Sequence, residues 1–443
     1  MDRLCASLDS ATSDDLIQKS ALQDGHASPT IRLKALRKFR VLMLRAIQDR
    51  CMDSVDKEKL GRIMRNMGSM IEHVSELDII ACYAKAVDDQ KLQTTQSLQS
   101  ICHAIEIGAL VLEILTASEF DKRIFPEGLI LSCLQLVKNQ LDNIIYPLFS
   151  LTIYDDDTTH FQTNARSFLQ FAESMRQSRV DLATLLPLIT RFLRYTFKLL
   201  QQDEIDDHMI VVIAYISMGP FFHEYDDQKP SCLIPFVEDM SVHPFEQLKY
   251  NSMDMLCKLF SNYPRHRLWM LEEILTSLNS MTSMDHTVKR YRLRNNTTIH
   301  IMSALFMQLI QSCCTVTDLT GNRNWLRQWE LKAQKMEKAN NDQQLSNLRS
   351  TLMKKASITW KSGIEAASQS AVYFVEMLLS KCKSRKKESY SVVEYRIIVE
   401  DILNDVMTVL NNPEWPVAEL IIRVFSKILV CICLPLSPQF ITH

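Results

Sequence analysis

Five residues between two apolar segments have the chemical types that an enzyme or a metal site needs. They are Asp203, Glu204, Asp206, Asp207 and His208. Carboxylates beside a histidine could transfer protons or bind a metal ion. However, no second ligands follow at helical spacing, and acidic residues are favoured at the positive N-terminal end of a helix. We therefore interpret the cluster as a helix start, with Asp206 or Asp207 as the N-cap.

The other candidates for chemistry have similarly ordinary explanations. Asp155–Asp157 with His160 are typical of a solvated acidic loop, and Cys102 beside His103 is typical of a buried thiol on a helix. No phosphate-binding loop, nucleophile elbow or zinc-protease motif occurs, and the 12 cysteines include no C-x-x-C pair. The sequence predicts that the chain is not an enzyme and that it has no catalytic residue, cofactor or metal.

Basic residues form clusters that could follow a phosphate backbone, although the formal net charge of −2 predicts neither a nucleic acid nor a membrane as partner. Three clusters are candidate DNA-binding sites: Arg265, His266 and Arg267; Lys289, Arg290, Arg292 and Arg294; and Arg191, Arg194 and Lys198. Loops on one edge of a helical stack line up, so the first two clusters would share a ridge, which the third could extend. The alternative is that each run is simply a solvated helix edge.

The elements that would position these clusters are helices. Hydrophobic residues make up 47% of the chain, which has only 8 glycines and 13 prolines, and this composition favours helices over a parallel α/β fold. Apolar residues recur every three or four positions, for example over residues 101–115, 130–141, 188–199, 248–260, 302–310 and 417–428. Breaks in this helical pattern, many of them at prolines such as Pro187, suggest repeating helix pairs of roughly 40 residues each. We predict an all-α, HEAT/armadillo-like helical-repeat solenoid.

Composition also predicts the organisation along the chain. Residues 1–30 indicate a disordered lead-in, 31–321 helical repeats, 322–356 a charged insertion that is partly helical at best, and 357–443 further repeats. Scattered cysteines and a polar N-terminus without a signal peptide indicate a reducing compartment. The apolar stretch Val424–Leu436 is too short to cross a bilayer, so no membrane is expected as a partner.

Four segments resemble the cohesin loader family (adherin, Nipped-B-like) and occur in the family's order. They are Pro235–Asp239; Tyr263 to Arg267, which reads Y-P-R-H-R; Tyr291-Arg292-Leu293 with Gln308–Gln311; and Asn412–Leu420, which reads N-P-E-W-P-V-A-E-L. The match is good over about residues 185–435 and more diffuse over 60–185. Because both order and spacing agree, the resemblance is specific.

The resemblance implies a hook-shaped HEAT-repeat protein that acts on chromatin in the nucleus. Such a protein works with a TPR-type partner subunit, binds the SMC ATPase heads and kleisin of cohesin, loads cohesin onto double-stranded DNA and stimulates its ATPase. The resemblance assigns DNA contact first to Arg265 and His266, and then to Arg292.

Family members are much longer than this chain. We therefore expect residues 357–443 to be truncated at the C-terminus and the arm that binds the TPR partner to be largely absent, so that the chain is a fragment or a shortened relative. The alternative function is a protein-only HEAT-repeat adaptor of the transport-receptor or phosphatase-scaffold type, and an enzyme is the third.

Overall fold

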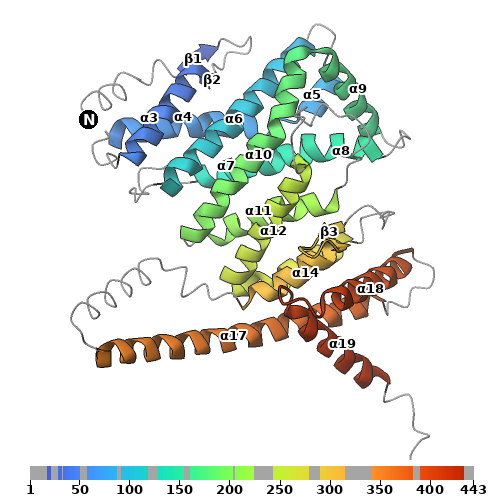
Figure 1. The fold of residues 1–443 in the computed structure, drawn as a ribbon. Coiled ribbons are helices and arrows are strands. Elements are labelled where there is room, and N and C mark those ends of the chain that lie inside the picture. Colours follow the sequence, from blue (N-terminus) through green and yellow to red (C-terminus); the bar gives the residue numbers. More distant parts are fainter. Residues whose placement is uncertain are drawn as a thin grey trace, which may run out of the picture. The chain divides into compact units, whose positions relative to one another are not determined.

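The structure is a computed structural model of the 443-residue chain (Figure 1). It describes residues 17–20, 28–31, 33–49, 57–86, 91–117, 128–153, 160–202, 205–223, 243–278, 290–314, 342–382 and 390–433. These residues are almost entirely helical, so the predicted all-α, HEAT-like fold is confirmed. The chain divides into two compact units, Met1–Ser252 and Met253–His443. No feature of the sequence predicts this boundary, which lies within one helix.

Unit 1 consists of helices that pack around two long central ones. Its elements are β1 (Ile17–Ser20), β2 (Ser28–Ile31), α3 (Leu33–Gln48), α4 (Lys57–Ser75), α5 (Ile79–Lys85), α6 (Lys91–Ala117), α7 (Leu129–Gln140), the π-helical turn η4 (Leu141–Ile145), α8 (Tyr146–Ile153), α9 (His160–Ser174), α10 (Arg176–Gln202), α11 (Asp207–Met218), the 3₁₀ turn η5 (Gly219–Phe222) and the first part of α12 (Pro244–Asn262). The central pair is α6 and α10, which pack against each other along their length. Ile105 and Leu112 of α6 and Phe192 of α10 are fully buried, as the predicted stripes require.

The predicted break at Pro187 is wrong, because α10 continues through it. Proline in a helix interior loses one backbone hydrogen bond and costs about 3 kcal/mol. Pro187 is exposed, whereas its neighbours Leu185, Leu186 and Ile189 are fully buried. Burial of such side chains contributes about 1.5–3 kcal/mol each, so tertiary packing outweighs the proline.

One helix of unit 1 is long and apolar enough, by length and composition, to cross a membrane. It is Gln93–Thr116 of α6, and 78% of its apolar window is buried inside the protein. That burial is typical of a core helix, which also explains why α6 is apolar around most of its circumference.

The acidic cluster partly coincides with a helix start. Asp206 is the N-cap of α11, with extended backbone angles, and Asp207 lies in the first turn. The Asp206 side chain makes no capping hydrogen bond, so its favourable effect is that of a negative charge at the helix N-terminus. Asp203 and Glu204 of this cluster, and the loop Asp155–Asp157, lie outside the described residues.

Unit 2 places its helices around the second half of one long helix. Besides the rest of α12, it contains η6 (Pro264–His266), α13 (Arg267–Ser277), β3 (Arg290–Arg292), β4 (Thr298–His300), α14 (Ile301–Ser312), α17 (Asp342–Cys382), α18 (Tyr390–Val409) and α19 (Val417–Cys433). α17 packs against α13, α14, α18 and α19. The buried Tyr395 hydroxyl of α18 donates to the Leu275 carbonyl of α13 at 2.8 Å, and so fixes α18 to the end of α13.

The structure describes residues near two of the predicted boundaries, the end of the lead-in at residue 30 and the end of the charged insertion at residue 356. Within the predicted lead-in, β1 and β2 form a short antiparallel pair in which Ile17 faces Ile31, and the remaining residues of 1–27 lie outside the described ranges. Within the predicted insertion, residues 342–356 form the beginning of α17, which crosses the expected boundary at 356 without a break. Residues 322–341 lie outside the described ranges.

A half-buried histidine should make the stability of unit 1 depend on pH. The His223 ring stacks on the Tyr146 ring, with centroids 4.0 Å apart and an interplanar angle of 7°. Burial lowers the pKa of His223 from its ordinary 6.5 to about 4, with Asp142 opposing and Lys249 reinforcing that shift. The unfolded chain therefore binds a proton near pH 6.5, whereas the folded chain does so only near pH 4.

The contribution of His223 to stability is thus complete above about pH 6.5 and is lost as the pH falls towards 4. We expect a loss of about 3 kcal/mol in the free energy of unfolding across this window. The variant His223→Phe, which keeps a ring against Tyr146, should show a correspondingly smaller loss in urea denaturation at pH 7 and pH 4.5. Burial also lowers the pKa of His103, and this adds the same pH-dependent loss of stability to the unmodified chain and to the variant. Equal losses in the two proteins would contradict the assignment.

Candidate functional site

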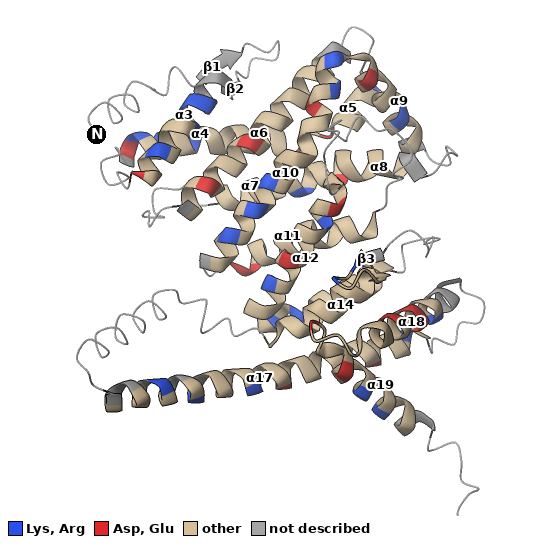
Figure 2. Cartoon of the chain, viewed as in Figure 1, with Lys and Arg blue, Asp and Glu red and all other residues tan. Residues whose placement is uncertain are grey.

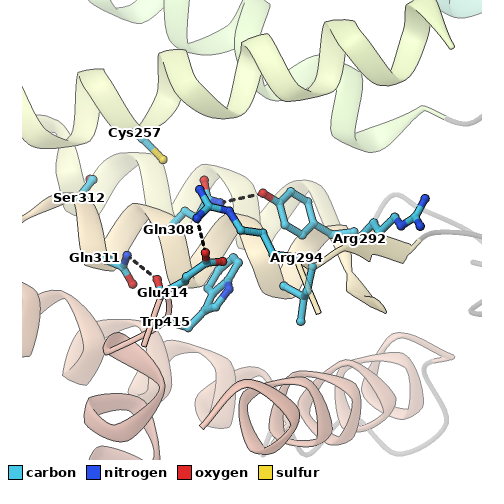
Figure 3. A pocket seen from close by; sticks show the side chains of 10 residues that line it. Cys257, Arg292, Arg294, Gln308, Gln311, Ser312, Glu414 and Trp415 are labelled. Atoms are coloured by element: carbon cyan, nitrogen blue, oxygen red, sulfur yellow. Dashed lines mark hydrogen bonds and ion pairs between the residues drawn. The ribbon is translucent and has the colours of Figure 1, made fainter. Parts of the chain in front are cut away.

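Four parts of the chain line one pocket in unit 2: α12, the β3–β4 hairpin, α14 and the turn before α19 (Figure 3). The cavity has a volume of about 430 Å³. Its lining consists of Cys257, Tyr291, Arg292, Leu293, Arg294, Gln308, Gln311, Ser312, Glu414 and Trp415. Most of these residues belong to the two motifs that resemble the cohesin loader family around residues 291–311 and 412–420. The sequence did not predict that the two motifs converge.

The first segment is the hairpin of β3 and β4, which an all-helical pattern does not predict. Asn296 adopts the left-handed conformation with φ 64°, which asparagine tolerates better than most residues. The Asn295 side chain accepts hydrogen bonds from the backbone N–H and the hydroxyl of Thr297, at 3.1 and 2.7 Å. These interactions close the turn, and Leu293 N–H donates to the Thr297 carbonyl at 2.9 Å.

The hairpin leads directly into α14 and is fixed there by a charged residue of α18. His300 is the N-cap of α14, and both its backbone N–H and its ring Nδ1 lie 2.9 Å from Oδ2 of Asp405. A carboxylate at a helix N-terminus satisfies an otherwise unpaired N–H and is favoured by the helix dipole. Asp405 therefore positions the hairpin and α14 relative to α18.

The second segment is the turn before α19. The Asn412 side chain accepts a hydrogen bond from Glu414 N–H at 3.0 Å, and Trp415 N–H donates to the Asn412 carbonyl at 2.9 Å. Pro416 follows, and proline suits the start of a helix because its missing N–H would have had no partner there. The turn directs the Trp415 side chain into the interior of unit 2, where it is only 4% exposed.

The segments are joined by specific contacts (Figure 3). The rings of Tyr291 and Trp415 meet edge to face, with centroids 5.9 Å apart. Gln308 donates from Nε2 to the Tyr291 hydroxyl at 3.3 Å, and Gln311 donates to the Glu414 carbonyl at 3.0 Å. Residues of α14 therefore hold the hairpin on one side and the 412–416 turn on the other.

The pocket is suited to binding and offers no reactive group among its described lining residues. Burial raises the pKa of the Cys257 thiol, so that it is protonated and a poor nucleophile. The Ser312 hydroxyl donates to the Leu309 carbonyl at 2.7 Å and has no base beside it in the lining. Gln311 Oε1 is buried and accepts no hydrogen bond from any described residue.

The first predicted DNA-binding cluster divides into two kinds of residue. Arg265 is exposed in η6, and the half-buried His266 lies edge-on to Trp269 with ring centroids 6.2 Å apart. Arg267 instead donates to the carbonyls of Phe260 and Ser261, at 2.6 and 3.1 Å. These are the last carbonyls of α12, so Arg267 caps that helix.

The second predicted cluster is partly engaged within the pocket. Arg294 is 88% exposed and forms an ion pair with Glu414 at 2.6 Å. Arg292 donates to the Asn296 side chain at 3.0 Å across its own hairpin turn and points away from Glu414 (Figure 3). Lys289 and the Arg290 side chain lie outside the described residues. That this cluster shares a ridge with Arg265 stays a prediction.

The third predicted cluster lies on α10 in unit 1 (Figure 2). Arg194 and Lys198 are exposed, and the Lys198 ammonium lies 5.1 Å from the centre of the Tyr195 ring. Arg191 is half-buried, and its Nε and one terminal nitrogen are buried without a hydrogen-bond partner among the described residues. Burial lowers the pKa of Arg191, and the nearby Arg40 lowers it further. Arg194 and Lys198 are therefore the accessible members of this cluster.

No family model matches the chain. Known proteins do match it along most of its length. It is 23% identical over 386 residues to Nipped-B-like protein B of Danio rerio, and 23% identical over 386 residues to the Nipped-B-like protein of Homo sapiens; each alignment covers 86% of this chain and 12% of the relative. It is 25% identical over 357 residues to the sister chromatid cohesion protein mis4 of Schizosaccharomyces pombe, covering 79% of this chain and 20% of that protein. The predicted resemblance to the cohesin loader family is confirmed.

The fold of the cohesin loaders agrees with that of this chain. The C-terminal fragment of the Chaetomium thermophilum cohesin loader SCC2 superimposes with a TM-score of 0.66 at 18% identity, covering 100% of this chain and 30% of that one. The chain thus spans 12–20% of the length of these curated cohesin-loader relatives and less than a third of the solved one. The Pro235–Asp239 motif lies outside the described residues, whereas the other motif segments are in unit 2.

Proposed function

We propose that this chain is a non-catalytic scaffold that binds DNA and cohesin, and so contributes to the loading of cohesin onto chromatin in the nucleus. The observation that carries the proposal is the pocket of unit 2, where two cohesin-loader motifs are held together by the contacts of Tyr291, Gln311 and Trp415. A distant relative that keeps the fold of the loaders at low sequence identity is expected to retain residues that contact each other in this way.

Duplex DNA is the proposed nucleic-acid ligand, bound through its phosphates without readout of sequence. The exposed Arg265 with His266 is the first contact, because it matches the basic–histidine pair of the loader motif and projects from the turn between α12 and α13. Arg292, Arg194 and Lys198 are further exposed candidates. We do not include Arg267 in the proposed interface, because its guanidinium caps α12.

Cohesin is the proposed protein partner, through its SMC ATPase heads and its kleisin, and stimulation of its ATPase is the proposed consequence. A TPR-type subunit is the proposed second partner, and the arm that would bind it is not assigned to any part of this chain. The relatives are named as cohesin loaders or cohesion proteins, which supports these assignments for a related chain.

A pull-down from nuclear extract with the whole chain as bait tests the proposal. We expect SMC and kleisin subunits to be recovered, and to persist after nuclease treatment because the contact is with protein. Recovery of Ran or of a phosphatase catalytic subunit, without cohesin, would instead support the protein-only adaptor.

A further inference from the structure

One exposed arginine at the pocket of unit 2 is held by a carboxylate. Arg294 lies in the turn of the β3–β4 hairpin, its side chain is 88% exposed, and its guanidinium is 2.6 Å from the Glu414 carboxylate (Figure 3). Among the exposed cations of the predicted DNA-binding clusters that the structure describes, Arg294 is the one that forms an ion pair. Arg292 instead donates to the neutral Asn296 side chain. Glu414 therefore neutralises a cation that a phosphate could reach from solvent.

The backbone of Glu414 places its carboxylate opposite Arg294. The Glu414 N–H donates to the Asn412 side chain at 3.0 Å, and the Glu414 carbonyl accepts a hydrogen bond from Gln311 Nε2 at 3.0 Å. Both contacts hold the main chain, whereas the described partner of the side chain is Arg294. The charge of the carboxylate can therefore be removed without losing either contact that fixes the turn.

The hairpin that carries Arg294 is anchored as well. Leu293, the preceding residue, is 4% exposed, and its N–H donates to the Thr297 carbonyl at 2.9 Å. At the end of the hairpin, the His300 N–H donates to the Asp405 carboxylate at 2.9 Å. The ion pair thus joins two anchored turns, and it can open by movement of the exposed Arg294 side chain alone.

An ion pair as exposed as this one is weak, because water and salt screen it and because ordering a long side chain costs conformational entropy. A phosphate accepts the same paired hydrogen bonds from a guanidinium as a carboxylate does. Duplex DNA presents many phosphates together, and each phosphate that a cation neutralises releases a counterion. Duplex DNA can therefore displace Glu414 from Arg294. After displacement, the 35% exposed Glu414 would repel the nearby phosphates.

We propose that Glu414 competes with DNA phosphate for Arg294 and so sets the affinity of unit 2 for duplex DNA. The inference rests on the proposed DNA binding and adds one contact to it, since Arg294 binds phosphate once Glu414 is displaced. Glu414 lowers the affinity in two ways: its ion pair must open, and its negative charge stays beside the phosphates. The released carboxylate also attracts a cation from solution, which makes the salt dependence shallower than the number of phosphate contacts implies.

Fluorescence anisotropy of a labelled duplex across a salt series, with the full chain, tests this competition. The variant Glu414→Gln removes the charge and keeps the turn. We expect it to bind duplex about three- to fivefold more tightly at low salt, because it frees Arg294 from an exposed ion pair. The slope of log affinity against log salt concentration should become steeper by about one. The midpoint of urea denaturation should stay close to that of the unmodified chain.

Two controls separate this competition from the general effect of removing a negative charge. Glu419→Gln makes the same change on α19, where it frees Arg423 from a comparably exposed ion pair outside the predicted clusters. In the Arg294→Gln background, Glu414→Gln has no arginine to release. In both cases, the substitution of glutamate should raise the affinity for duplex by no more than about twofold.

A gain after Glu414→Gln that is no larger than the gain after Glu419→Gln would overturn the competition. So would a gain that persists in full in the Arg294→Gln background. If duplex binding still depended on Arg265 and His266 in that case, the proposed function would stand without this contact. If neither the unmodified chain nor the Glu414→Gln variant bound duplex, the proposed DNA binding and this inference would both be wrong. Binding by the Glu414→Gln variant alone would support the competition and refute DNA binding by the unmodified chain.

Discussion

Replacing Trp415 with alanine is expected to lower the free energy of unfolding by about 3–5 kcal/mol, the usual cost of truncating a buried tryptophan. Trp415 is 4% exposed and meets the Tyr291 ring edge to face. Its loss removes the buried indole and the contact that joins the 412–416 turn to the β3–β4 hairpin. Chemical denaturation followed by circular dichroism measures the change.

The matched control for this prediction is Met407→Ala. Met407 belongs to the same unit and is 59% exposed, so its truncation should change the free energy of unfolding by no more than about 0.5 kcal/mol. Tyr291→Phe tests the hydrogen bond from Gln308 while it keeps the ring against Trp415, and should cost about 1 kcal/mol. A loss after Trp415→Ala no larger than that after Met407→Ala would show that the pocket does not organise unit 2.

Reversing the charge at the α12–α13 turn should weaken the binding of duplex DNA. In the variant Arg265→Glu with His266→Glu, the loss of at least one phosphate contact and the added repulsion should reduce affinity about tenfold or more at low salt. The slope of log affinity against log salt concentration should become shallower by about one. Fluorescence anisotropy of a labelled duplex across a salt series measures both quantities.

Two controls separate DNA contact from other effects. Arg423→Glu makes a charge change of the same sign on α19, at an exposed residue that pairs with Glu419 and lies outside the predicted clusters. It should leave the affinity for DNA close to that of the unmodified chain. Arg267→Met should lower stability instead, because it uncovers the Phe260 and Ser261 carbonyls. Unchanged affinity and salt slope after reversal of Arg265 and His266 would remove them from the proposed interface.

The helices were predictable because their periodicity reflects burial that tertiary structure enforces. The apolar stripes of α6, α10 and α14 coincide with fully buried residues such as Ile105, Phe192 and Leu305. Local signals alone were misleading where packing opposed them, as at Pro187 within α10. The β3–β4 hairpin was missed because its strands have three residues each and depend on distant partners, among them Asp405 and Trp415.

The candidate site was predictable only in part, for a similar reason. Ordered motifs identified the segments that contain Arg265, Arg292 and Trp415, and charge indicated which residues could meet phosphate. Neither signal distinguishes a cation that faces solvent from one that satisfies carbonyls, as Arg267 does for α12. The meeting of Tyr291, Gln311 and Glu414 around a pocket depends on long-range packing, which spacing along the sequence does not encode.

We propose that this chain holds DNA and cohesin together without chemistry of its own. Mass photometry of the purified chain with purified cohesin and a short duplex tests it most directly. We predict a complex of the chain with cohesin that becomes more abundant when duplex is added, and that loses this increase in the Arg265→Glu, His266→Glu variant. If the chain binds neither cohesin nor DNA, alone or together, the proposed function is wrong.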